Sequence, residues 1–189
     1  MQHLLQSVTA AVAQRNWYAA VSTALAVPDI CGWLEDPAAG SQNRYVAWFD
    51  RFVGPEYIRE IGPDRERHVF LSGRDCYALR CAFLHEGREE IVSQSAREAL
   101  ERFQFTVAPP TWTVHCNQLG SKLQLQVDIF CAQIVAGGER WLVEVGSQPE
   151  VGARMPSLLR IYDVNGTPIN QTYPGDAANR GPLYAPLLR

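Results

Sequence analysis

Arg80 and His85 are the residues whose types and spacing first suggest chemistry. They lie in the stretch "SGRDCYALRCAFLHEG", residues 72–87, and His85 is the one histidine that follows an arginine by five positions. A neutral imidazole accepts a proton near physiological pH, and a guanidinium binds phosphate through two parallel hydrogen bonds. Together the two side chains suit proton transfer at a phosphodiester.

The same pair also has a purely structural interpretation. An arginine can pair with a carboxylate, and a histidine in the last turn of a helix is favoured by the helix dipole. Five residues along an α-helix span about 7.5 Å and about 140° of rotation, so Arg80 and His85 should lie on different faces. We therefore expect one chain to form a poor catalytic pair, and a two-fold axis to bring one protomer's histidine beside the other's arginine.

Four further side chains in this stretch are candidate supporting residues: Asp75, Tyr77, Cys81 and Glu86. Asp75 and Glu86 flank the predicted helix, where they could assist His85. Each also has a structural interpretation. Asp75 fits a helix cap, and Glu86 fits a solvated position. Tyr77 fits a place in the core or in an interface.

Two other kinds of site use the cysteines near His85. Cys81 and His85 are four residues apart, and with Cys76 or the pair at 115–116 they could bind zinc. Cys81 could also act as a nucleophilic thiolate with His85 as its base, but no orienting Asn or oxyanion element accompanies them. Reduced cysteine is more often a small core residue, so we expect no metal or other cofactor.

The elements that must position these residues are mostly helical. Ser72 is a predicted N-cap, with Asp75 in the acidic position of a capping box, and Gly87 fits the glycine that ends a helix. Apolar residues at three- and four-residue steps predict three earlier helices, over residues 2–14, 17–34 and 43–53. Asn16 is a good N-cap for the second of these. Pro28 either kinks that helix or begins another.

The later part of the chain changes period. Alternating apolar residues over 112–127 predict a small β-hairpin. Asp128 then caps a last helix ending near residue 145, unless that helix already begins at Ser121. Residues 54–67 have the composition of a surface excursion, and residues 88–105 fit either an exposed helix or a loop.

This pattern predicts a mainly α fold in two parts. Residues 1–146 form a helical bundle domain with the inserted β-hairpin, and residues 147–189 form a second hairpin, around Asn165–Gly166, and an extended C-terminal tail.

Composition bounds the functional classes. The chain is 47% hydrophobic and 20% charged, which is normal for a globular protein. A net charge of −3 provides no general basic field for long nucleic acid, but it does not exclude a local basic cleft. Five scattered cysteines without a CxxC motif favour reduced thiols. With neither a signal peptide nor a membrane span in the sequence, we expect a cytoplasmic protein that does not contact membranes.

The segment "LRCAFLHEG" resembles the R-x4-6-H motif of the HEPN superfamily, with Arg80 and His85 at the matching positions. Many HEPN proteins are metal-independent ribonucleases of toxin–antitoxin, abortive-infection and CRISPR-linked defence systems. The resemblance implies a HEPN-like bundle of four or five helices, a homodimer formed through the motif helices, and a composite active site between them. Cys81 departs from the Asn, Asp or His that often follows the arginine. Gly87 departs from the tyrosine that nucleotidyltransferase antitoxins modify.

Two functional hypotheses follow. In the first, the protein is a dimeric HEPN-type endoribonuclease that leaves 2′,3′-cyclic phosphate ends, in a toxin or defence system with an antitoxin partner. In the second, it is a catalytically inactive helical module that binds a protein partner or RNA. The acidic net charge and Cys81 favour the second hypothesis, and the place of the motif at the end of a helix favours the first.

Overall fold

The structure, a computed structural model, describes residues 1–169 of the 189-residue chain. The chain divides into Met1–Leu159 and a second unit that begins at Arg160. This division lies beyond the boundary expected at residue 146. The reason is a short helix after Gly146 that packs on the bundle: Val151 is buried, and Arg154 donates to the Leu34 carbonyl oxygen at 2.6 Å.

The first unit is mainly helical, as predicted. Within residues 1–169 the α-helices are α1 (Gln2–Ala13), α2 (Trp17–Glu35), α3 (Ser41–Phe52), α4 (Gly73–Cys81), α5 (Val127–Glu144) and α6 (Pro149–Arg154). Short helical turns cover Gly54–Tyr57 and Met155–Ser157, and a π-helical turn, η2, covers Ala82–Glu86. None of the helices in residues 1–169 combines the length and apolar content that a membrane span requires.

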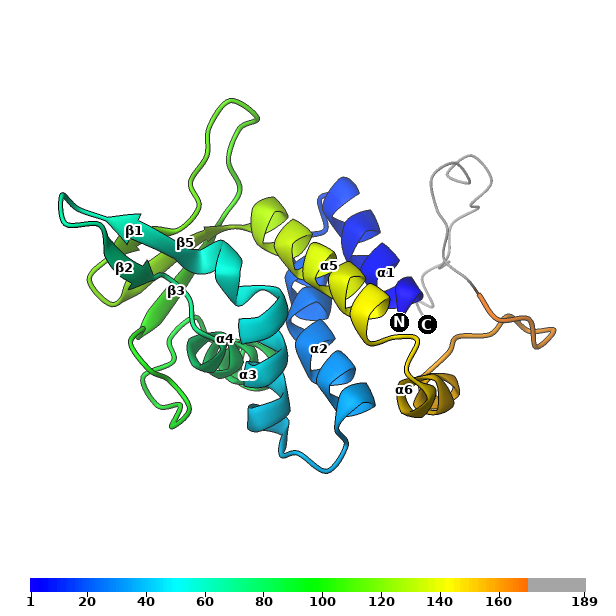
Figure 1. Cartoon of the computed structure of the whole chain (residues 1–189). Helices are drawn as coiled ribbons and strands as arrows, with labels where there is room; N and C mark the ends of the chain where they lie inside the picture. Colours follow the sequence, from blue (N-terminus) through cyan, green and yellow to red (C-terminus); the bar gives the residue numbers. More distant parts are fainter. Residues whose placement is uncertain (170–189) are drawn as a thin grey trace. The chain divides into compact units, whose positions relative to one another are not determined.

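Helix α2 is the central element of the bundle. It packs against α1, α3 and α5, and Figure 1 shows these helices around it. Its N-cap is Asn16, as expected, and the Asn16 side chain accepts a hydrogen bond from Ala19 N. Pro28 lies inside one continuous helix, which decides the alternative that the sequence left open.

Two small sheets lie at one end of the bundle (Figure 1). The first is a hairpin of β1 (Ile58–Ile61) and β2 (Glu66–Val69), in the segment expected to be a surface excursion. The second contains β3 (Arg102–Thr106), β4 (Asn117–Leu119) and β5 (Lys122–Gln126) in the order β3-β5-β4. The β4–β5 pair is a hairpin within the segment 112–127 where one was predicted, with its turn at Gly120. The parallel pairing of β3 with β5 was not predicted.

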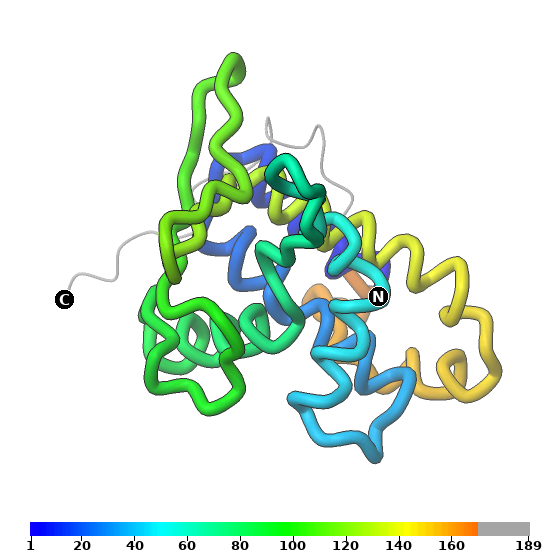
Figure 2. Tube along the Cα trace, turned by 60° about the vertical axis from the view of Figure 1, so that its left-hand side comes forward, coloured from blue at the N-terminus to red at the C-terminus, as the bar shows by residue number. Residues whose placement is uncertain are grey.

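The predicted first arm of that hairpin was wrong over residues 112–116. Alternating residues form a strand where one of its faces is buried, but Trp112 is 69% exposed. Residues 107–116 instead form a long loop that projects from the unit (Figure 2). Its base is fixed by Gln126, whose side chain accepts from Val114 N and whose own N–H donates to His115 Nδ1.

The start of α5 also corrects the sequence interpretation. Because β5 extends to Gln126, the helix begins at Val127 with Gln126 as N-cap, and Asp128 lies in the first turn rather than at the cap. Gly137 and Gly138 do not interrupt α5. A Cβ atom at Gly137 would meet the Val53 side chain at 2.6 Å, so the glycines allow close helix packing.

The described part of the second unit is a tight turn. Gly166 N donates to the Asp163 carbonyl oxygen, and Tyr162 and Pro168 form an antiparallel bridge. Gly166 has a φ of 80°, which favours glycine. This confirms the hairpin predicted at Asn165–Gly166. The predicted tail lies outside the described residues.

The contact between α2 and α3 is too close for a side chain at Gly32. A Cβ atom there would lie 2.9 Å from the Arg44 carbonyl oxygen and 3.0 Å from Arg44 Cβ. Gly32 is one helical turn after Asp29, so this contact also fixes how closely Asp29 and Arg44 approach.

We expect Gly32→Ala to destabilise the protein by about 1–3 kcal/mol, because overpacking outweighs the better helix propensity of alanine. Urea unfolding followed by circular dichroism measures this. Gly152→Ala is the matched control, since Gly152 is also helical but has no atom within 4 Å of a built Cβ. Equal urea midpoints for the two variants would contradict the close packing.

Candidate functional site

Helix α4 has both of the ends that the sequence predicted. The Ser72 hydroxyl accepts a hydrogen bond from Asp75 N at 3.2 Å, and Gly87 adopts the left-handed conformation with a φ of 66°. Between them the helix does not stay α-helical. It widens into the π turn η2, where the Gly87 N–H reaches back to the carbonyl oxygens of Ala82 and Phe83.

The π turn brings Arg80 and His85 together within one chain. Arg80 Nη1 lies 3.1 Å from His85 Nε2. Arg80 lies near the end of α4 and His85 in the π turn that follows it, and a π turn, closed by a hydrogen bond between residues five apart, rotates the chain less per residue than an α-helix does. The prediction that a single chain would hold this pair apart was therefore wrong, because it assumed regular α-helix geometry.

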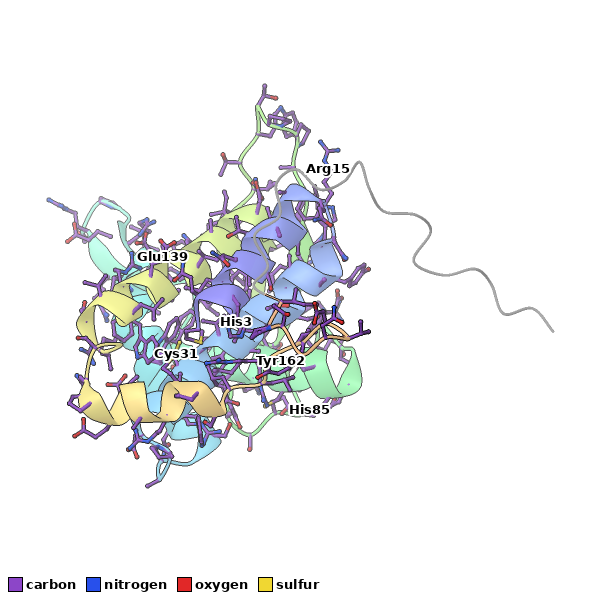
Figure 3. All side chains as sticks on the ribbon, turned by 90° about the vertical axis from the view of Figure 1, so that its right-hand side faces the viewer. His3, Arg15, Cys31, His85, Glu139 and Tyr162 are labelled. Carbon is purple, nitrogen blue, oxygen red and sulfur yellow. The ribbon has the colours of Figure 1, made fainter. Side chains whose placement is uncertain are left out.

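The chemistry of the two groups decides which of them donates in the Arg80–His85 contact. A guanidinium has five N–H donors and no acceptor, so Arg80 donates and His85 Nε2 accepts. A hydrogen bond of this kind uses the lone pair of His85 Nε2. His85 is exposed, at the outer end of the segment that carries α4 (Figure 3). This arrangement holds a base close to a cation at the protein surface.

Arg80 is fixed from its other side by Asp29 of α2. Arg80 Nη2 donates to Asp29 Oδ2 at 3.0 Å, and the two side chains are 19% and 13% exposed. Asp29 also accepts from Arg44 Nε of α3 at 2.7 Å and from the Ser41 hydroxyl. We call Asp29, Arg44, Arg80 and His85 the arginine–histidine cluster. It joins α2, α3 and α4.

Asp29, Ser41 and Arg44 were not predicted as site residues. A signal for Asp29 was present, because it is the only charged residue between Trp17 and Leu34. A carboxylate in an apolar helix requires a partner. Nothing in the local sequence identifies that partner, since Arg44 and Arg80 are 15 and 51 positions away.

Two of the four predicted supporting residues lie beside the cluster. Cys81 is half-buried, with its Sγ 3.9 Å from Arg80 Nη1. Tyr77 is half-buried against Tyr45 of α3, with 5.4 Å between ring centroids, and burial raises the pKa of the Tyr77 hydroxyl. Cys81 therefore contacts the cluster directly, and Tyr77 lies next to Ser41, which bonds Asp29.

The other two, Asp75 and Glu86, form hydrogen bonds with the segment 88–100 and not with the cluster. Asp75 is 2% exposed, and its carboxylate accepts from the backbone N–H groups of residues 98–100. It anchors the segment 88–101, which forms a loop and not a helix. Glu86 is exposed and accepts from Arg88 and Gln94. Neither side chain contacts His85.

The positions of the cysteines support neither the zinc hypothesis nor the Cys–His hypothesis. Within residues 1–169, no group of three or more His, Cys, Asp or Glu side chains could hold a metal ion. Cys76 is fully buried, and burial raises the pKa of its thiol to about 12. The Cys81 thiol instead faces Arg80, with its Sγ 3.9 Å from Nη1, and no hydrogen bond in residues 1–169 joins it to His85. The chain therefore offers the arginine–histidine pair as its candidate site.

Comparison with known proteins does not assign the chain to a family: no family model, curated protein or solved structure matches it.

We expect Asp75→Asn to destabilise the protein by about 1–3 kcal/mol, because an amide NH₂ replaces an acceptor that faces three backbone N–H groups. Urea unfolding measures this, and limited trypsin digestion should show faster cleavage at Arg97 in the released loop. Asp64→Asn, at an exposed position between β1 and β2, is the control. A stability equal to that of the control would show that Asp75 does not anchor the loop.

Proposed function

We propose that the protein is a metal-independent endoribonuclease of HEPN type, with Arg80 and His85 as its catalytic residues. The observation that carries this proposal is the 3.1 Å contact between Arg80 Nη1 and His85 Nε2 at an exposed site. This contact supports the proposal because an imidazole acceptor and a guanidinium so close together can both reach a single phosphodiester group. The similarity of "LRCAFLHEG" to the HEPN motif supports the same assignment.

The chemistry follows from these two groups. A phosphate that enters the site draws Arg80 Nη1 onto a non-bridging oxygen, which frees the lone pair of His85 Nε2. His85 then accepts the proton of the ribose 2′-hydroxyl, and the 2′-oxygen attacks phosphorus. The bond from phosphorus to the 5′-oxygen breaks. The products are a 2′,3′-cyclic phosphate and, after protonation of the 5′-oxygen, a 5′-hydroxyl.

A homodimer has a different role in this proposal from the one that the sequence suggested. One chain already supplies both an arginine and a histidine, so a second copy is not needed to pair them. It would supply a second imidazole, which in its protonated form can donate to the leaving 5′-oxygen. A cytoplasmic toxin or defence role with an antitoxin partner belongs to the same proposal and rests on the resemblance alone.

A second candidate function is a catalytically inactive module that binds a protein partner or RNA. A specific observation favours it. Arg80 is already ion-paired with Asp29, so the arginine–histidine cluster can equally serve to hold α2, α3 and α4 together. In addition, the loop 107–116 exposes Trp112, and β4 exposes 84% of Leu119. Exposed apolar side chains of this size suit contact with a partner.

Purified protein in EDTA should cleave single-stranded RNA and leave 2′,3′-cyclic phosphate ends. His85→Asn should reduce the rate by about 100-fold or more, because a general base is lost. Arg80→Gln should have a similar effect. DNA and 2′-O-methyl RNA should stay intact, because neither offers a 2′-hydroxyl.

Two substitutions serve as controls for this experiment. His68→Asn alters a histidine that bonds Gln118, and Arg51→Gln alters an arginine in exposed ion pairs. Both variants should retain the parent's rate. The ribonuclease proposal is wrong if RNA stays intact with the parent protein, or if the His85 and Arg80 variants cleave as fast as these controls. Retained binding of RNA without cleavage would instead support the inactive module.

A further inference from the structure

Arg80 makes an incomplete set of hydrogen bonds for an arginine beside a carboxylate. Its Nη2 donates to Asp29 and its Nη1 contacts His85, but its Nε is buried and has no hydrogen-bond partner. An arginine and a carboxylate commonly form a two-pronged pair, with two parallel N–H···O bonds. Arg80 and Asp29 form only one of these bonds.

The reason lies on α3. Asp29 Oδ1, which would complete a two-pronged pair with Arg80, accepts from Arg44 Nε at 2.7 Å. The Ser41 hydroxyl lies 3.2 Å and 3.3 Å from the two Asp29 oxygens. Arg44 is itself fixed, since its Nη1 donates to the Ala39 carbonyl oxygen and its backbone packs on Gly32. Arg44 therefore competes with Arg80 for Asp29 from a constrained position.

We propose that Arg44 is a positioning residue for the catalytic pair, and this proposal rests on the ribonuclease function proposed above. By occupying Asp29 Oδ1, Arg44 limits Asp29 to a single hydrogen bond with Arg80. Arg80 is thereby held at Nη2 while Nη1 stays directed at His85 and available to a phosphate. Without Arg44, Asp29 would take Arg80 through Nε and Nη2, and the guanidinium would turn away from His85.

The charges of the cluster support this division. One carboxylate faces two guanidinium groups, and both arginine side chains are 19% exposed. The excess positive charge lies in a region with little solvent to screen it, so it attracts an anion strongly. If Asp29 paired with Arg80 alone, the charge of Arg80 would be neutralised. Sharing Asp29 between two arginines keeps part of the charge of Arg80 for the substrate.

The test is Arg44→Met in the full chain, which removes the competing cation and keeps much of the side-chain volume. The ¹⁵N chemical shifts of the His85 ring nitrogens, measured without RNA, report whether Nε2 still accepts a hydrogen bond. We expect the Nε2 signal to lose the shift of a hydrogen-bonded acceptor. In RNA cleavage we expect kcat to fall by about tenfold or more, with a smaller change in KM, because the arginine is misplaced in the transition state.

Two further variants make the result specific. Arg51→Met is the matched control, since Arg51 is also on α3 but pairs with Glu35 and Glu144 at the surface. Arg44→Lys should restore the ring-nitrogen signal and most of kcat, because an ammonium can still occupy one oxygen of Asp29. If Arg44→Met does not fold, Arg44→Gln is the test, with the same expected direction in both readouts, because its neutral amide is a weaker competitor for Asp29 Oδ1.

The inference is overturned if Arg44→Met gives the same ring-nitrogen shifts and the same kcat as Arg51→Met, or if Arg44→Lys rescues neither readout. Its failure can be distinguished from failure of the proposed function. If the parent protein does not cleave RNA, the ribonuclease proposal is lost, but the ring-nitrogen shifts still show whether Arg44 directs Arg80 toward His85.

Discussion

The arrangement of this protein's candidate site depends on one half-buried carboxylate. Asp29 is 13% exposed in the middle of an otherwise apolar helix, and a charge in that place is costly unless it is paired. Its partners come from α3 and α4, so pairing requires these two helices to meet α2 at the same point. Close packing at Gly32 makes the approach of α3 possible. The pairing of one acid thus fixes the geometry of a site whose other residues lie far apart in the sequence.

A second carboxylate has the same kind of role for the loop behind the site. Asp75 belongs to α4, but it is bonded to the backbone of residues 98–100 and makes no contact with the arginine–histidine cluster. Ordering an irregular loop is entropically costly, and three N–H groups directed at one carboxylate offset part of that cost. Helix α4 therefore presents two chemically different ends: a buried, bonded N-terminus and an exposed π turn that carries His85.

Local signals predicted those parts of the structure that depend on local contacts. Ser72, Asn16 and Gly87 mark helix ends through hydrogen bonds and backbone conformations within a few residues, and each was predicted correctly. The parallel pairing of β3 with β5 and the ion pairs of Asp29 join segments distant in the chain, so no local pattern revealed them. In the candidate site, Arg80 and His85 were chosen from their residue types and their match to a known motif. Their contact was not predicted, because the turn type that creates it has no sequence signature.

The π turn has a consequence for how such a motif can vary. Four residues of regular α-helix and five residues of a wider turn both bring the last side chain back above the first. A single-residue change in length between Arg80 and His85 can therefore be absorbed by a change of helical pitch, with the two side chains still meeting. In such a motif, a change in the number of intervening residues can be compensated by a change in the type of turn. The quantity under constraint is the distance between a guanidinium and an imidazole.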